Sequence, residues 1–437
     1  MNRSTLTLAA VAFASATAVH AQQTRVPVVA LPASNAKTSE TFGGIIGVRE
    51  VSGGKLLVND AARRQLVLLD TTFRSHTIAL DSTDGVANAY GRARAPLLAY
   101  LGDSSLMADP QSQSLRVIDG KGQVVRSIAL PNPRDVIFMI SAASGVDSKG
   151  RLVYRGPVPQ LPNMQQLPLS QRPDSAVILR ADLDARTVDT VGRLKARDGA
   201  GVLSDMSDPA KPKLTITINP LPSLDEWALL SNGTIALVRG QDYHIDFIQP
   251  DGSRSSSPKL SFDWKRLTDD DKQKLVDSAR AAQEAMAAGR GAAPPPADGG
   301  GRGRGGAGGG GGGAVGAVGV RGGGPGGGVP PTVETVYLPL AQITDYYPPI
   351  RPGAAMADRD GNLWVLPTTS GQSQAGELVY DVINTKGELF QRVRLPSGRS
   401  IAGFGTGGVV YMMSGDRTNG FYLERTRLAS GTRTASR

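Results

Sequence analysis

The chain has 437 residues, no cysteine, three histidines and a formal net charge of +9. Without cysteine it holds no disulfide, and so few histidines argue against a histidine metal centre or a Ser-His-Asp triad. Lysine and arginine are spread along the chain rather than clustered with aromatic residues, so we expect no nucleic-acid partner.

Residues 1–21 have the pattern of a signal peptide. A basic residue at Arg3 precedes an apolar run from Leu6 to Val19, and the ending Val19-His20-Ala21 fits cleavage after Ala21. We therefore expect a secreted or periplasmic protein. Since no later apolar run approaches the roughly 18 to 20 residues of a membrane-spanning helix, we expect no membrane span.

Short strand patterns then recur along the chain. A Gly or Ser turn that enters a short apolar strand is found at 52–60, 102–110, 147–155, 230–238, 358–366 and 405–413. Most copies are followed by an apolar strand, a polar turn and an outer strand, at 65–80, 114–130, 176–194, 244–260 and 378–395. Each unit thus holds two hairpins. The predicted fold is all-β, a monomeric six-bladed β-propeller of four-stranded antiparallel blades.

The Gly-x-Leu-x-Val and Val-Ile-Asp-x-x-Gly phrases of these units resemble the blades of six-bladed propellers of the NHL and TolB-like type. The resemblance covers most of Gly43 to Ala429. It implies the construction of the blades and leaves the function open, since similar propellers include binding modules, lactonases and lyases. Calcium-dependent lactonases that resemble this fold bind their metal through carboxylates and Asn side chains at the channel mouth. The candidates implied here are Asp225, Glu226 and Asp358.

The sixth unit is one outer strand short. The segment from Thr24 to Pro32 resembles the other outer strands, so we expect it to pair with Tyr422 to Leu428 and close the ring. The chain is therefore divided as follows. Residues 22–263 hold the N-terminal closing strand and blades one to four, and residues 264–331 are an insertion. Residues 332–429 hold blades five and six, and residues 430–437 are a flexible tail.

The insertion is predicted to begin as a helix. Thr268 is the expected N-cap and three aspartates follow in the first turn; helix formers continue to Met286. Leu275, Ala279, Ala282 and Met286 form a weak apolar stripe that we expect on the flank of the propeller. From Gly289 to Pro331 the chain is mostly Gly and Pro, which predicts a disordered loop.

Two motifs that suggest chemistry have simpler interpretations. Asp358 to Asn362 resembles the start of a calcium loop, but the twelfth position holds Thr369 instead of the required Glu, so a hairpin turn is favoured. His76 and His244, which remain after removal of the signal peptide, fall in predicted strands and are interpreted as ordinary strand residues.

Two Pro-bounded connections combine aromatic rings with positive charge, as expected for an anionic or carbohydrate-like ligand. Their residues are Tyr90, Arg92, Arg94, Tyr346, Tyr347 and Arg351. The main hypothesis is a non-catalytic module that binds a small molecule or a protein, without a cofactor. The alternative is a metal-assisted lactonase or lyase that acts in the central channel with a divalent metal such as calcium.

Overall fold

The computed structural model describes residues 26–83, 88–141, 144–162, 164, 167–205, 207–208, 211–291, 332–369 and 377–428. The predicted signal peptide, nearly all of the predicted Gly- and Pro-rich loop, and the predicted C-terminal tail lie outside these residues.

Most of the described chain is organised in sheets of four or five strands, each named after its innermost strand. The β3 sheet consists of β3 (Ile45–Val51), β4 (Lys55–Asp60), β5 (Gln65–Leu69) and β6 (His76–Leu80). The β7 sheet consists of β7 (Leu97–Ala99), β8 (Ser105–Asp109), β9 (Ser114–Ile118) and β10 (Val124–Ala129). The β11 sheet consists of β11 (Ser144–Val146), β12 (Leu152–Arg155), β13 (Ser175–Asp182) and β14 (Thr187–Lys195).

Three further sheets follow along the chain. The β17 sheet consists of β17 (Glu226–Leu229), β18 (Ile235–Val238), β19 (Ile245–Ile248) and β20 (Arg254–Ser256). The β22 sheet consists of β22 (Ala355–Ala357), β23 (Leu363–Val365), β24 (Val379–Ile383), β25 (Leu389–Arg394) and β1 (Val28–Ala30). The β26 sheet consists of β26 (Arg399–Phe404), β27 (Val409–Asp416), β28 (Gly420–Arg427) and β2 (Ala36–Lys37). Apart from β1, neighbouring strands within these sheets are antiparallel.

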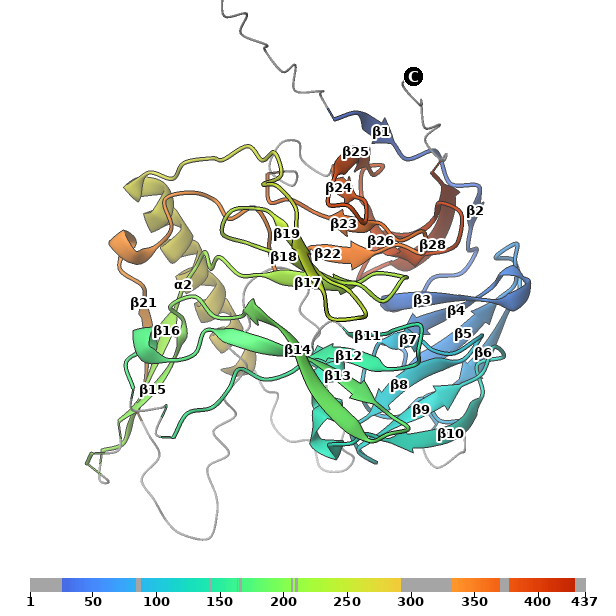
Figure 1. Ribbon diagram of the computed structural model, residues 1–437, viewed down its shortest axis with the longest axis horizontal. Coiled ribbons are helices and arrows are strands. Elements are labelled where there is room, and N and C mark those ends of the chain that lie inside the picture. Colours follow the sequence, from blue (N-terminus) through green and yellow to red (C-terminus); the bar gives the residue numbers. More distant parts are fainter. Residues whose placement is uncertain are drawn as a thin grey trace, which may run out of the picture.

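The innermost strands stand side by side around a central axis. Contacts join β26 to β3, β3 to β7, β7 to β11, β11 to β17, and β17 to β22 (Figure 1). Apolar clusters fill the spaces between consecutive sheets, and one such cluster, containing Trp364 and Phe404, joins the β22 and β26 sheets. Another cluster, containing Val58 and Tyr411, joins the β26 sheet back to the β3 sheet. The arrangement is a β-propeller with an all-β core.

Aspartates at the start of the hairpin turns explain the repeated sequence pattern. Asp358 accepts hydrogen bonds from the backbone and side-chain nitrogens of Asn362, each at 2.8 Å, and from the indole nitrogen of Trp364 at 2.9 Å. Gly361 supplies the left-handed backbone with φ of 91°. Asp147 accepts the corresponding bonds from Lys149 and Arg151 in the β11 sheet. This stretch is therefore a hairpin turn, as predicted.

The N-terminal segment closes the ring, but by a different pairing from the predicted one. Strand β1 does not pair with Tyr422 to Leu428; it runs parallel to β25, with Val28 opposite Arg392. The outer strand of the β26 sheet is β2, in which Ala36 is opposite Arg425. The predicted segment is displaced because Leu31 is buried in the cluster between these two sheets, so the chain crosses from one to the other at this residue.

A side unit projects from the propeller (Figure 1). It is a three-stranded sheet of β15 (Gly201–Asp205), β16 (Lys213–Ile218) and β21 (Thr332–Tyr337), accompanied by helix α2 (Asp269–Gly291). The sequence placed 201–218 and 332–337 in the propeller. These segments instead form the side unit, because β21 pairs in parallel with β16. The two strands are far apart in sequence, so the spacing of the repeats does not predict their pairing.

Helix α2 begins after Thr268, as predicted, and the hydroxyl of Thr268 accepts a hydrogen bond from the Asp271 nitrogen at 3.2 Å. Its buried residues are Val276 and Lys272. Of the predicted apolar stripe, Leu275 packs against the cluster that contains Val276 and Ala279 is half-buried, whereas Ala282 is exposed, so the stripe is only partly correct. Lys272 is buried because its ammonium group meets Asp345 Oδ1 at 2.6 Å.

The other helical segments are short. They are α1 (Phe138–Ser141) and 3-10 turns at Ser52–Gly54, Pro133–Ile137, Leu169–Gln171 and Leu340–Gln342. Among the described residues, no helix has the length and apolar character needed to cross a membrane.

Candidate functional site

The two ends of the central axis are built differently. At the entry end the innermost strands begin, and the second strands of the sheets finish; Glu226 and Arg155 lie here. At the turn end the first hairpin of each sheet turns back, as at Ser231 and Arg359. In a propeller each sheet contributes short loops to both ends, so residues distant in sequence meet there.

Glu226 is the unusual carboxyl group of the entry end. It is the first residue of β17, half-buried, and accepts a hydrogen bond from the backbone nitrogen of Gly353, which precedes β22. Burial raises the pKa of Glu226 to about 7; the Gly353 hydrogen bond and the Arg155 charge act in the opposite direction, and the Asp225 charge adds to the rise. Glu226 therefore exchanges a proton near neutral pH.

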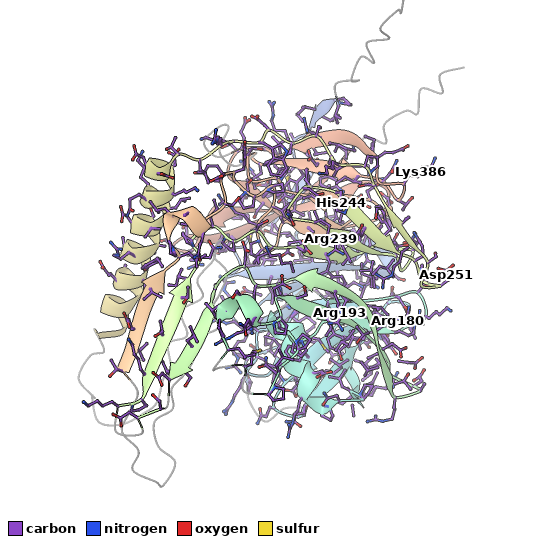
Figure 2. All side chains as sticks on the ribbon, turned by 60° about the vertical axis from the view of Figure 1, so that its left-hand side comes forward. Arg180, Arg193, Arg239, His244, Asp251 and Lys386 are labelled. Atoms are coloured by element: carbon purple, nitrogen blue, oxygen red, sulfur yellow. The ribbon has the colours of Figure 1, made fainter. Side chains whose placement is uncertain are left out.

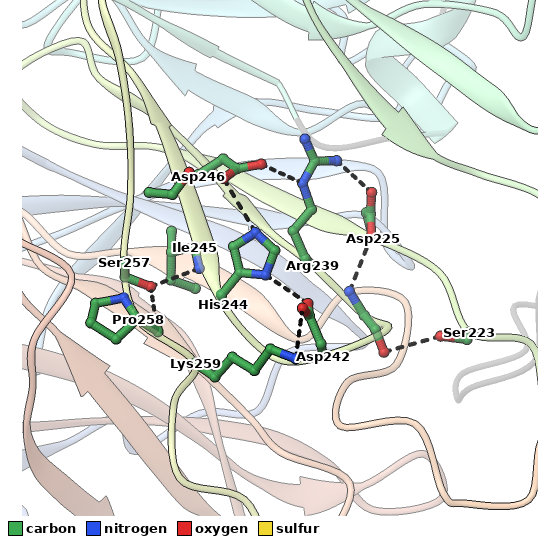
Figure 3. Close-up of polar contacts among 12 residues, drawn as sticks. Ser223, Asp225, Arg239, Asp242, His244, Ile245, Asp246, Ser257, Pro258 and Lys259 are labelled. Atoms are coloured by element: carbon green, nitrogen blue, oxygen red, sulfur yellow. Dashed lines mark hydrogen bonds and ion pairs between the residues drawn. The ribbon is translucent and has the colours of Figure 1, made fainter.

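Asp225, its neighbour in the chain, lies in the opposite environment. Its carboxylate accepts a hydrogen bond from Arg239 at 2.6 Å (Figure 3). It also accepts hydrogen bonds from the backbone nitrogens of Lys195 at 2.9 Å and Gly240 at 3.1 Å. Gly240 is required here, because a Cβ at this position would collide with the backbone oxygen of Leu224. These contacts fix the chain where β17 begins, and so they position Glu226.

The network continues into the β18–β19 connection. Arg239 donates from Nε to Asp246 Oδ2 at 2.7 Å, and His244 lies between Asp246, at 3.3 Å, and Asp242, at 2.6 Å (Figure 3). Figure 2 shows Arg239 and His244 on the same flank of the molecule. His244 thus lies in a loop before β19 rather than in a strand, whereas His76 is in β6 as expected.

The contrast between Asp225 and Glu226 has chemical meaning. Asp225 accepts hydrogen bonds from Arg239 and two backbone nitrogens, while burial of Glu226 raises its pKa. A carboxyl group whose pKa is raised toward neutral pH is suited to acid–base chemistry. Arg155 adds a fixed positive charge within electrostatic reach of Glu226, suited to a carbonyl or carboxylate oxygen.

The three carboxylates considered for a metal are not together. Asp225 and Glu226 lie at the entry end, but Asp358 follows β22 and belongs to the turn end, where Asn362 and Trp364 occupy its oxygens. Within the described parts of the chain, no group of three or more His, Asp or Glu side chains is arranged to hold a metal ion.

The first predicted ligand loop splits into a buried and an exposed part. Tyr90 is 1% exposed, and its hydroxyl donates to Asn59 Oδ1 at 2.5 Å, so it is a core residue rather than a ligand contact. Arg92 and Arg94 are exposed. Arg94 lies just before β7, on the same end of the axis as Glu226.

The second predicted loop also divides. Tyr346 is 42% exposed and makes an edge contact with Trp264, and Tyr347 lies under Lys265 next to the side unit. Both tyrosines therefore belong to the boundary with helix α2. Arg351 is exposed shortly before β22, so it shares the entry end with Arg94 and Glu226.

Sequence reasoning missed Arg155 and the backbone of Gly353. Arg155 ends a strand of the repeat, and its charge after the apolar run "LVY" was the available signal. Gly353 acts through its backbone nitrogen, which no residue pattern reveals.

No model of a known protein family matches the chain, and a search of curated proteins found no relative. Similar solved structures include a gluconolactonase from Xanthomonas campestris, with 9% identity, TM-score 0.36, and 90% of this chain and 92% of that one covered. Regucalcin, a calcium-binding protein from Agrobacterium tumefaciens, has 10% identity, TM-score 0.37, and coverage of 93% and 98%. A virginiamycin B lyase from Staphylococcus aureus has 10% identity, TM-score 0.34, and coverage of 90% and 87%.

The activities in two of these names belong to the enzymatic alternative rather than to the non-catalytic module. Because the sequence identities and TM-scores are low, however, these similarities do not indicate what this chain does. The propeller fold rests on the sheet topology, and function has to be argued from the side chains.

Proposed function

We propose that the protein is an exported six-bladed β-propeller enzyme that acts on a small carbonyl compound at the entry end of its axis. In this proposal the six sheets are all the blades, and the enzymatic alternative replaces the non-catalytic module. Glu226 exchanges a proton with the substrate, and Arg155 faces the oxygen on which negative charge develops.

The proposal rests on the half-buried Glu226 carboxyl, which accepts a hydrogen bond from the Gly353 backbone and lies within electrostatic reach of Arg155. A binding module has no need of a desolvated carboxyl that titrates near neutral pH, whereas a general acid–base residue works best with its pKa near the working pH. Exposed Arg94 and Arg351 on the same end offer positive charge to attract an anionic substrate.

Hydrolysis of a cyclic ester illustrates the chemistry. The Glu226 carboxylate accepts a proton from water as its oxygen adds to the carbonyl carbon, and Arg155 stabilises the resulting oxyanion. The ring carbon–oxygen bond then breaks, and the departing oxygen takes the proton from Glu226. The products are a hydroxy acid and the regenerated carboxylate.

The test is a panel of small lactones incubated with the mature protein, with proton release followed at constant pH. We expect turnover that Glu226→Gln lowers by about 100-fold, the usual share of a general acid–base residue. Asp251→Asn, in an exposed turn, is the control and should keep full activity. Turnover unaffected by Glu226→Gln would overturn the assignment.

The non-catalytic module gives a different result. In that case, a ligand from the same panel would bind without being consumed. Its affinity would then depend on Arg94 and Arg351 and would not follow the titration of Glu226.

A further inference from the structure

A second polar site lies at the turn end of the axis, away from Glu226. Its cavity of about 280 Å³ is shared by several sheets. The cavity is lined by residues that include Arg49 and Glu50 of β3, Ser231 of the β17–β18 turn, Arg359 of the β22–β23 turn, and Gly405 and Thr406 of the β26–β27 turn.

The two arginines have unused hydrogen-bonding capacity. Arg359 is half-buried, and among the described residues it has neither a hydrogen-bond partner nor an ion pair. Arg49 donates from its two terminal nitrogens to the backbone oxygens of Glu50 and Gly102, each at 2.9 Å. Its Nε is buried and has no partner within the described part of the chain. A buried donor without an acceptor is costly and is normally satisfied.

Electrostatics around the cavity favour an added negative charge. Burial, followed by the nearby charge of Arg359, lowers the pKa of Arg49 to about 10, and burial also lowers the pKa of Arg359. The charges of Asp103 and Glu50 act in the opposite direction on Arg49, and that of Glu50 on Arg359, but they do not offset the burial of either guanidinium group. A bound anion would relieve the desolvation of both groups and their mutual repulsion.

The nearby carboxylates are already engaged. Glu50 accepts hydrogen bonds from the hydroxyl of Tyr411 at 2.9 Å and from that of Thr406 at 3.4 Å. It lies so close to Gly405 that a Cβ there would collide with its Oε2. Asp103 accepts from the Ser52 backbone nitrogen, and Asp360 accepts from those of Gly407 and Gly408. The lining itself therefore carries two positive charges and one negative charge.

We propose that this cavity binds a small oxyanion, a carboxylate or phosphate group, between the guanidinium groups of Arg49 and Arg359. A guanidinium fork matches the two oxygens of such a group and makes strong charge-assisted hydrogen bonds. The hydroxyl of Ser231 borders the same space. Because the lining has one net positive charge, a singly charged carboxylate is favoured over phosphate. This site is independent of the proposed function, since it lies at the opposite end of the axis.

The experiment is an NMR titration of the mature protein labelled with ¹⁵N-arginine. Sodium acetate or inorganic phosphate is added at constant ionic strength, and the Nε–H signals of Arg49 and Arg359 are followed. We expect saturable shifts of both signals, with tighter binding of acetate. Tighter binding of phosphate would leave the oxyanion site in place and overturn the preference for a carboxylate.

Variants separate a built site from general attraction by positive charge. Arg359→Gln should weaken acetate binding by about tenfold or more because the fork and the charge are lost, and Arg359→Lys should give an intermediate value. Since Arg359 makes no hydrogen bond or ion pair among the described residues, neither change should unfold the protein. Arg417→Gln, at an exposed position of the β27–β28 turn, is the matched control and should bind like wild type.

Two outcomes would overturn the proposal. One is a pair of arginine signals that drift without saturation in the wild-type protein. The other is equal acetate affinity in the wild type and in Arg359→Gln.

Discussion

Neighbouring acidic residues can have opposite roles when the backbone sends their side chains to different surroundings. Asp225 and Glu226 are adjacent in the chain, yet Asp225 is held by Arg239 and two backbone donors, while Glu226 has one backbone donor and the charge of Arg155 within electrostatic reach. Alternation along a strand directs successive side chains to opposite faces, which is why this separation arises at the first residues of β17.

The raised pKa of Glu226 predicts a pH dependence of stability. The folded state keeps this proton up to about pH 7, whereas the unfolded chain loses it near the ordinary glutamate pKa of 4.5. Stability conferred by the protonated group is therefore complete below the lower pKa, falls as pH rises between the two values, and stays low above about 7.

Glu226→Gln should remove this loss, since the amide carries no charge at any pH. At about pH 8 the variant should be more stable than wild type, by at most about 3 kcal/mol, and at about pH 4 the two should be nearly equal. Urea unfolding at both pH values measures the difference. The same stability difference at both pH values would show that Glu226 is not desolvated in the folded state.

Single elements far apart in sequence complete the ring. Strand β2 supplies the outer edge of the β26 sheet, and the Thr38 hydroxyl accepts a hydrogen bond from the backbone nitrogen of Leu423 at 3.1 Å. Strand β1, by contrast, extends the neighbouring β22 sheet at its outer edge. The two strands therefore differ in importance for closure of the ring.

Two truncations distinguish them. A chain that begins at Ser34 lacks β1 but keeps β2, and a chain that begins at Glu40 lacks both. We expect the first to unfold in one cooperative transition. The second should show faster amide exchange at Leu423 and more aggregation, because the edge of β28 is left unpaired. Equal exchange at Leu423 in the two chains would contradict this role of β2.

The elements were more predictable from sequence than the sites. Turn residues such as Asp358 and Gly361 indicate hairpins in the sequence, because their side-chain and backbone preferences act locally. The parallel pairing of β21 with β16 joins residues more than a hundred positions apart, so no local pattern indicates it. For the same reason Tyr90, which has the appearance of a ligand contact in sequence, is found in the core against Asn59.

At the scale of the whole molecule, a closed ring of sheets brings together side chains that are isolated in the sequence. Glu226, Arg155 and Gly353 come from three sheets or their connections at the entry end. Arg49 of the β3 sheet and Arg359 of the β22 sheet meet at the turn end. The sequence indicated Glu226 only as a candidate metal ligand. Its partners depend on the order of the sheets around the axis, which the repeats do not reveal.

We propose that the entry end holds a carboxyl group, that of Glu226, prepared for proton transfer. The most direct measurement is an NMR titration of the Glu226 side chain in protein labelled with ¹³C-glutamate, assigned with Glu226→Gln. We expect a midpoint near pH 7 and a further rise in Arg155→Gln, because the arginine charge lowers this pKa. A midpoint near the ordinary glutamate pKa of 4.5, unchanged by Arg155→Gln, would show that Glu226 is not prepared for proton transfer.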